Sequence, residues 1–153
     1  MSSINERFIE AVHERIKHHG LTPTQIGRAM GGSDRLACQR GHLLIKHPAT
    51  GRIALTYAVR VCDAVGLDLV AKRKGKPAGR RGQLVEEVRA QLDADERTVA
   101  WLARLVGLYR QQVNQWMKGN GINLESVAVL CDALDIEILI RPRKGWAPPE
   151  VSK

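Results

Sequence analysis

Residues 99–119 decide the fold, and they read Val99-Ala-Trp-Leu-Ala-Arg-Leu-Val-Gly-Leu-Tyr-Arg-Gln-Gln-Val-Asn-Gln-Trp-Met-Lys-Gly119. Thr98, just before them, is a typical helix N-cap, and Gly107 allows the positive φ of a tight turn. The apolar residues fall where two short helices flanking that turn must pack together: Leu102, Ala103, Val106, Leu108, Val113 and Trp116. The stretch therefore predicts a helix from Thr98, a turn at Gly107 and a second helix over 109–117.

The second of these helices keeps a polar outward face. It carries Arg110, Gln111, Gln112, Asn114, Gln115 and Lys118. Two short helices joined by a glycine turn form the helix-turn-helix arrangement, whose second helix enters the major groove of DNA. In that groove Arg binds guanine O6 and N7, while Asn and Gln bind adenine N6 and N7. The face therefore predicts sequence-specific DNA binding, against the plainer interpretation of a polar surface helix without a ligand.

These residues resemble the Cro and phage-repressor (XRE-type) helix-turn-helix family over nearly all of 84–135, and more loosely over 4–66. The resemblance is carried by Thr98, Leu102-Ala103, Gly107, residues 110–115, and Lys118-Gly119 followed by 124–134. It implies that bases are contacted by Arg110, Gln111, Asn114 and Gln115. The family's phosphate sites fall on Thr98, Lys118 and Asn120, and we expect further phosphate contacts from Arg104, Tyr109 and Gln112. The strand that follows resembles that of antitoxin-type members.

A second copy of this plan lies upstream. Val61-Cys-Asp-Ala-Val-Gly-Leu-Asp-Leu-Val-Ala-Lys-Arg-Lys-Gly75 recurs, with one insertion, as Leu130-Cys-Asp-Ala-Leu-Asp-Ile-Glu-Ile-Leu-Ile-Arg-Pro-Arg-Lys-Gly145. Thr22-Pro-Thr-Gln-Ile-Gly-Arg-Ala-Met-Gly31 likewise lies over Thr98-Val-Ala-Trp-Leu-Ala-Arg-Leu-Val-Gly107. Such a repeat predicts two similar modules. The expected fold is mainly α, with two tandem lambda-repressor-like helix-turn-helix domains of about four helices each, each followed by a short strand.

The repeat also sets the expected boundaries. We expect one domain at 1–71, a basic linker at 72–83, a second domain at 84–143 and a flexible tail at 144–153. The first copy predicts helices at 4–18 and 22–30, one from Ser33 and one after Pro48, and the second predicts helices at 84–92, from Thr98, and at 109–117 and 123–134. Strands are expected at 67–71 and 136–140, paired antiparallel within the chain as a pseudo-dimer; a homodimer that exchanges strands is the alternative.

The first copy departs from the family pattern in its recognition helix. That helix starts at Ser33, and Asp34 stands where a phosphate or guanine contact is expected. We expect Arg35 and Gln39 to contact bases. The phosphate contacts expected of this copy are Thr22, Thr24, Arg28, Ser33 and Arg40. The alternative is a degenerate copy that serves packing or dimerisation.

Most of the net charge lies in one segment. The chain has 24 Lys and Arg against 16 Asp and Glu, a net charge of +8, and residues 72–81 contain six of the basic residues and no acidic one. Gly and Pro in this segment predict an irregular, exposed linker. Phosphate contacts are expected from Lys72, Arg73, Lys74, Arg80 and Arg81. A tether that only improves solubility is the alternative.

Other classes of protein are disfavoured. Cys38, Cys62 and Cys131 are odd in number and lack C-x-x-C spacing, so we expect buried apolar thiols without disulfides, metal or cofactor. There is no nucleophile with an adjacent base, which argues against an enzyme. No apolar run is long enough for a membrane span or a signal peptide, so we expect a cytoplasmic protein with no membrane partner. The resemblance to the Cro and phage-repressor family implies a bacterial or phage protein.

The predicted function is a transcriptional regulator that binds double-stranded DNA at an operator or promoter. A repressor is expected, because occupying a promoter requires only a DNA-binding surface. The alternative is an antitoxin-like or phage-type module that holds a protein partner and binds DNA secondarily. Trp146-Ala-Pro-Pro149 in the tail is the apolar segment expected to contact such a partner.

Overall fold

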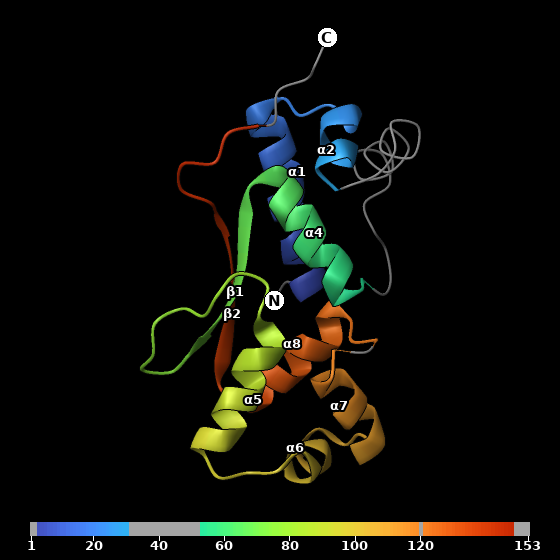
Figure 1. The fold of residues 1–153 in the computed structure, drawn as a ribbon, viewed down its shortest axis with the longest axis vertical. Coiled ribbons are helices and arrows are strands. Elements are labelled where there is room, and N and C mark those ends of the chain that lie inside the picture. The colour runs from blue at the N-terminus through green and yellow to red at the C-terminus, as the bar shows by residue number, and fades with distance from the viewer. Residues whose placement is uncertain (1–2, 31–52, 120, 149–153) are drawn as a thin grey trace. The chain divides into compact units, whose positions relative to one another are not determined.

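The computed structural model of this chain describes residues 3–30, 53–119 and 121–148. This part holds seven helices and a two-stranded sheet, which confirms a mainly α fold with a small β component (Figure 1). The elements in chain order are α1 (Ile4–His19), α2 (Pro23–Ala29), α4 (Leu55–Val65), β1 (Leu67–Arg73), α5 (Leu84–Ala94), α6 (Val99–Val106), α7 (Arg110–Met117), α8 (Leu124–Ala133) and β2 (Ile136–Pro142). The chain divides into two compact units: Met1–Asp68 with Ile140–Lys153 as unit 1, and Leu69–Leu139 as unit 2.

Local sequence signals set most helix ends. Thr22 begins α2 with a capping box, in which its hydroxyl accepts from the Gln25 amide N–H at 3.2 Å and Gln25 Oε1 accepts from the Thr22 amide at 2.9 Å. Asn123 caps α8, with Oδ1 2.8 Å from the Ser126 nitrogen. At its other end α1 stops at Gly20, which takes the left-handed conformation at φ 60°. These ends agree with the sequence predictions.

In unit 1 the core forms between three helices. Both α1 and α2 pack against α4. Phe8 and Val12 of α1, Ile26 of α2, and Val61 and Val65 of α4 are buried there. The apolar residues of α1 recur every three or four positions, so burial of one face of that helix follows from its sequence.

The two strands pair with each other, as expected from the repeat. The amide of Arg143, just after β2, donates to the carbonyl of Gly66, just before β1, at 2.8 Å. The end of one strand therefore lies beside the start of the other, and the strands are antiparallel. Each strand runs two residues further than its apolar run predicted, to Arg73 and Pro142, because backbone pairing continues past the buried side chains.

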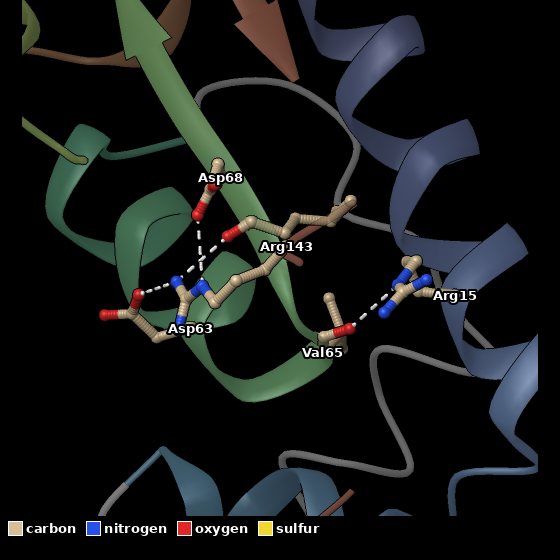
Figure 2. A network of polar contacts seen from close by, with 6 residues as sticks. Arg15, Asp63, Val65, Asp68 and Arg143 are labelled. Carbon is tan, nitrogen blue, oxygen red and sulfur yellow. Dashed lines mark hydrogen bonds and ion pairs between the residues drawn. The ribbon is translucent and has the colours of Figure 1, made fainter. Parts of the chain in front are cut away.

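Arg143 and Trp146 attach the segment after β2 to unit 1. The Arg143 guanidinium bonds Asp63 Oδ1 at 2.7 Å and Asp68 Oδ1 at 3.0 Å (Figure 2). The Trp146 ring lies 5.5 Å from the Arg15 guanidinium carbon, and a Cβ at Gly66 would overlap that ring. We expected a flexible tail with an exposed Trp146. The structure instead half-buries this ring, because it fills the space that the missing side chain of Gly66 leaves.

Unit 2 begins with a hairpin where an irregular linker was expected. Lys72 and Arg73 belong to β1, and the chain then turns so that Lys72 forms an antiparallel bridge with Ala78. The amide of Gly79 donates to the Ala71 carbonyl, and the amide of Gly82 to the Leu69 carbonyl, each at 2.8 Å. Here Gly and Pro mark the turn of a hairpin, whose backbone hydrogen bonds come from β1.

The helices of unit 2 enclose a separate aliphatic core. Contacts join α5 to α7 and α8, and α6 to α7 and α8. Leu84, Val88, Leu102, Val113 and Leu124 are all fully buried in it. This core fixes α6 and α7 against their neighbours.

The two cysteines in the described part are buried, as predicted. Cys62 in α4 and Cys131 in α8 align between the similar sequence segments 61–75 and 130–145, and they are 2% and 1% exposed. Burial is the main cause that raises the pKa of each thiol to about 12, so both are neutral thiols. Cys38 lies outside the described residues. Within the described ranges, no helix is both long and apolar enough to cross a membrane.

Candidate nucleic-acid interface

The helix pair of unit 2 forms at the predicted residues. The Thr98 hydroxyl accepts from the Trp101 amide at 3.1 Å and caps α6. The helix ends at Gly107, whose φ of 73° turns the chain, and the Leu108 amide bonds the Ala103 carbonyl at 2.9 Å. The chain enters α7 at Arg110, immediately after the turn. This is a helix-turn-helix in geometry as well as in sequence.

Packing determines which face of α7 is left outward. Leu102, Ala103 and Val113 are at most 1% exposed, and Trp116 and Met117 are also buried. The predicted contact residues Val106 and Leu108 are only half-buried. An additional bond holds the end of α7, where the Arg89 guanidinium of α5 donates to the Met117 carbonyl. The orientation of α7 is thus fixed by burial on one side and by a hydrogen bond at its end.

The opposite face of α7 carries the polar residues. Arg110, Gln111, Gln112, Gln115 and Lys118 are exposed. Asn114 is half-buried, because it lies closer to the packed side of the helix. Gln111, Gln115 and Lys118 follow the i, i+4, i+7 spacing that places side chains on one face of a helix. The structure therefore brings the predicted base-contacting residues together on one helix, with Asn114 the least accessible of them.

The residues expected to bind phosphates lie at the start and in the last turn of α6, in the turn, and at the two ends of α7. Thr98 and Arg104 are exposed, and Tyr109, in the turn, is 83% exposed. Thr98 stands at the N-terminus of α6, where the amide groups and the helix dipole favour an anion. Asn120, the remaining phosphate candidate of this copy, lies outside the described residues.

Arg97 is an exposed cation that the motif comparison did not single out. Its guanidinium carbon lies 4.8 Å from the centre of the Trp101 ring, a cation–π contact just before the start of α6. The sequence held only a weak sign of it, a basic residue directly before the N-cap Thr98. Leu105, on α6, is 53% exposed and is an apolar residue that the packing pattern did not place outward.

The corresponding site of the first copy is described only in part. Thr22 is exposed and caps α2, Thr24 is half-buried, and Arg28 is exposed. The other residues expected to contact DNA lie outside the described residues: Ser33, Arg35, Gln39 and Arg40.

Comparison with known proteins supports the prediction that unit 2 contains a helix-turn-helix DNA-binding domain. Residues 88–138 match the family model of the Cro/C1-type HTH DNA-binding domain. The match takes in most of α5, all of α6, α7 and α8, and the start of β2. It confirms the resemblance for the second copy of the repeat, whereas the first copy lies outside the matched residues. The comparison with curated proteins found no match, and neither did the comparison with solved structures.

Proposed function

We propose that this protein is a sequence-specific regulator of transcription that inserts α7 into the major groove of double-stranded DNA. The observation that carries the proposal is the position of the amide and Arg side chains within the Cro/C1-type domain. They occupy the exposed face of the second helix of a helix-turn-helix, and the opposite face of that helix is buried. That helix is the one that enters the groove in such motifs.

The chemistry of this face gives each residue a role. Arg110 is assigned to guanine, through bonds to O6 and N7, and Gln111 and Gln115 to adenine, through N6 and N7. Asn114 is half-buried in the free protein, so it reaches a base only when the helix lies deep in the groove. Each such pair contributes about 1–3 kcal/mol of discrimination against a wrong base.

Phosphate contacts fix the position of α7 in the groove. Thr98 offers a hydroxyl and the N-terminal end of α6, and Arg104 and Lys118 supply positive charge on either side. Tyr109 and Gln112 donate from the turn and the first turn of α7. These contacts add affinity for any duplex, and the base contacts add preference for one sequence.

We infer further that residues 1–71 and 84–143 are two such modules on one chain. The repeat in the sequence and the pairing of β1 with β2 within the chain support this reading. Two modules can occupy half-sites roughly 34 Å apart, one turn of DNA, without forming a homodimer. The two recognition segments differ, so the half-sites are expected to differ as well. We propose that the protein acts as a repressor, because repression by occupying a promoter requires only a DNA-binding surface.

Selection of bound sequences from random duplex DNA tests this function. We expect two dissimilar half-sites, with centres about ten base pairs apart, to be enriched. Enrichment of a single half-site would support base reading by unit 2 and contradict it for the first copy. If no sequence is enriched while the protein is folded and monomeric, the proposal of sequence-specific binding is wrong.

A further inference from the structure

The basic hairpin of unit 2, residues 72–82, is a fixed part of that unit. Three backbone links hold it along β1, namely the Lys72–Ala78 bridge and the bonds from the amides of Gly79 and Gly82. Unit 2 starts at Leu69, so the hairpin belongs to the same compact unit as α7. Figure 1 shows its turn, in the loop that follows β1, extending away from α5.

A side-chain anchor joins the hairpin to α5. Arg73 Nε lies 3.2 Å from Glu87 Oε2, and both side chains are mostly buried, at 17% and 23% exposed. Gly79, on the returning arm, lies against the same carboxylate, because a Cβ there would be 2.7 Å from Glu87 Oε1. One acidic side chain of α5 therefore contacts both arms of the hairpin.

The anchor divides the cations of the hairpin into two groups. The charge of Arg73 faces Glu87 and points toward the body of unit 2. Lys74, Lys76 and Arg80 are exposed, and the sequence from Lys72 to Arg81 contains no acidic residue to offset them. Lys74, Lys76 and Arg80 are three of the four exposed cations of this short hairpin, and together they form a surface that suits a chain of phosphates.

We propose that this hairpin is a second DNA contact of unit 2, which places Lys74, Lys76 and Arg80 on the phosphate backbone of the duplex read by α7. The inference rests on the proposed function. It differs from the expectation for a linker in four residues. Lys76 becomes a contact and Arg73 becomes a positioning residue, while Lys72, which is half-buried in β1, and Arg81 are not assigned a contact. Because phosphates carry no sequence information, the hairpin raises affinity for every duplex and leaves the preferred sequence unchanged.

The test measures binding of the full chain to a duplex carrying the selected site and to a random duplex, by fluorescence anisotropy at several salt concentrations. The variant is Lys74→Gln with Lys76→Gln and Arg80→Gln. The control is Lys17→Gln with Arg60→Gln and Arg141→Gln, which removes three exposed cations of unit 1. All six side chains are exposed, so both variants are expected to fold, as circular dichroism would verify.

The hairpin variant should lose affinity about 10- to 100-fold near 0.1 M salt, equally for both duplexes. Its slope of log K against log salt should be shallower by about 2.7, or 0.9 for each lost phosphate contact. An unchanged slope, or an equal change in the control, overturns the hairpin contact while the proposed function stands. If the wild-type protein does not distinguish the two duplexes, the proposed function fails first.

Two neighbouring residues test the role of the anchor. Lys74→Gln and Arg73→Gln remove the same charge one position apart, but only Lys74 is exposed. We expect Lys74→Gln to make the salt slope shallower by about 0.9 and Arg73→Gln to leave the slope unchanged. If both variants have the same slope and it is shallower than that of the wild type, Arg73 binds phosphate and its assignment as a positioning residue is wrong.

Discussion

Arg143 Nη2 lies 2.7 Å from Asp63 Oδ1, and these two residues are 80 positions apart in the sequence. The same guanidinium donates from Nε to Asp68 at 3.0 Å and from Nη2 to the Leu67 carbonyl at 3.1 Å (Figure 2). Burial disfavours the charged form of Arg143, but its bonds to the two carboxylates outweigh burial and raise its pKa. The segment after β2 therefore completes unit 1, which includes residues far apart in the sequence.

Replacing Arg143 should destabilise the protein. Arg143→Ala removes three hydrogen bonds and leaves Asp68 partly buried without that partner, so we expect a loss of about 1–2 kcal/mol in the free energy of unfolding. Urea denaturation followed by circular dichroism measures it. Arg141→Ala, two residues away on an exposed position of β2, is the control and should change stability by less than about 0.5 kcal/mol. Similar losses in both variants would show that the hydrogen bonds of Arg143 to Asp63, Asp68 and Leu67 do not contribute to stability.

Gly66 and Asp135 align between the similar sequence segments 61–75 and 130–145, and both have positive φ, at 77° and 58°. Asp135→Gly should stabilise the protein by up to about 1 kcal/mol, because glycine adopts this conformation without steric cost. Gly66→Ala should destabilise it by more than about 2 kcal/mol, since the new Cβ also meets the Trp146 ring.

Gly107→Ala separates the cost of backbone conformation from the cost of overlap. Gly107 also has a positive φ, but within the described residues no atom lies in the way of a Cβ. Thermal unfolding should rank the losses as Gly66→Ala greater than Gly107→Ala. The reverse order would contradict the packing of Trp146 on Gly66.

His19 should make stability depend on pH. Burial, and then the charges of Arg15 and His18, lower its pKa below the ordinary value of 6.5, and its ring meets Trp146 edge-on at 5.1 Å. The unfolded chain therefore takes up this proton at a higher pH than the folded protein. Protonation of His19 has no effect on stability well above pH 6.5. As the pH falls from about 6.5 toward the lowered pKa of the folded protein, the free energy of unfolding decreases.

Thermal unfolding between about pH 7.5 and pH 5 checks this sign. His19→Phe keeps an aromatic ring against Trp146 but cannot take up a proton. The melting temperature of the wild type should fall further over this range than that of the variant. An identical pH dependence of the two proteins would show that His19 does not contribute.

Thr98 allows its capping role to be separated from DNA binding. Asp is as good an N-cap as Thr, and its charge suits the start of α6, so Thr98→Asp should leave stability within about 0.5 kcal/mol of the wild type. The same carboxylate would repel a phosphate, so affinity for any duplex should fall. Thr98→Ala should instead cost about 1 kcal/mol of stability. Unchanged affinity in the Asp variant would remove Thr98 from the interface.

The local features of the fold could be predicted from the sequence. Capping residues such as Thr22, Thr98 and Asn123, and the turn at Gly107, act within one or two helical turns. The outward face of α7 could be predicted from the spacing of its apolar residues. The structure exposes the polar side chains of this face as expected, except that of Asn114, which is half-buried. These features could be predicted because a helix cap, and the face that a helix buries, are each determined by residues close together in the chain.

What the sequence did not reveal depends on contacts between distant residues. Trp146 looked like an exposed residue of a tail, because nothing near it indicates that Gly66 leaves room for its ring. The segment after Ala71 is predicted to be irregular because it contains Gly75, Pro77 and Gly79, but pairing with β1 and contact with Glu87 give it order. The sequence alone does not show that Arg73 pairs with Glu87 while Lys76 is exposed, so it could not separate a positioning residue from a candidate phosphate contact.

Arg110 tests the central claim, that the outward face of α7 reads bases, most directly. The measurement is the ratio of affinities of Arg110→Ala for the selected site, for the same site with a single guanine replaced, and for random DNA. We predict a loss of about 1–3 kcal/mol on the selected site, with the preference lost at one base pair and kept at the others. Equal losses on selected and random DNA, with every preference intact, would contradict base reading by α7.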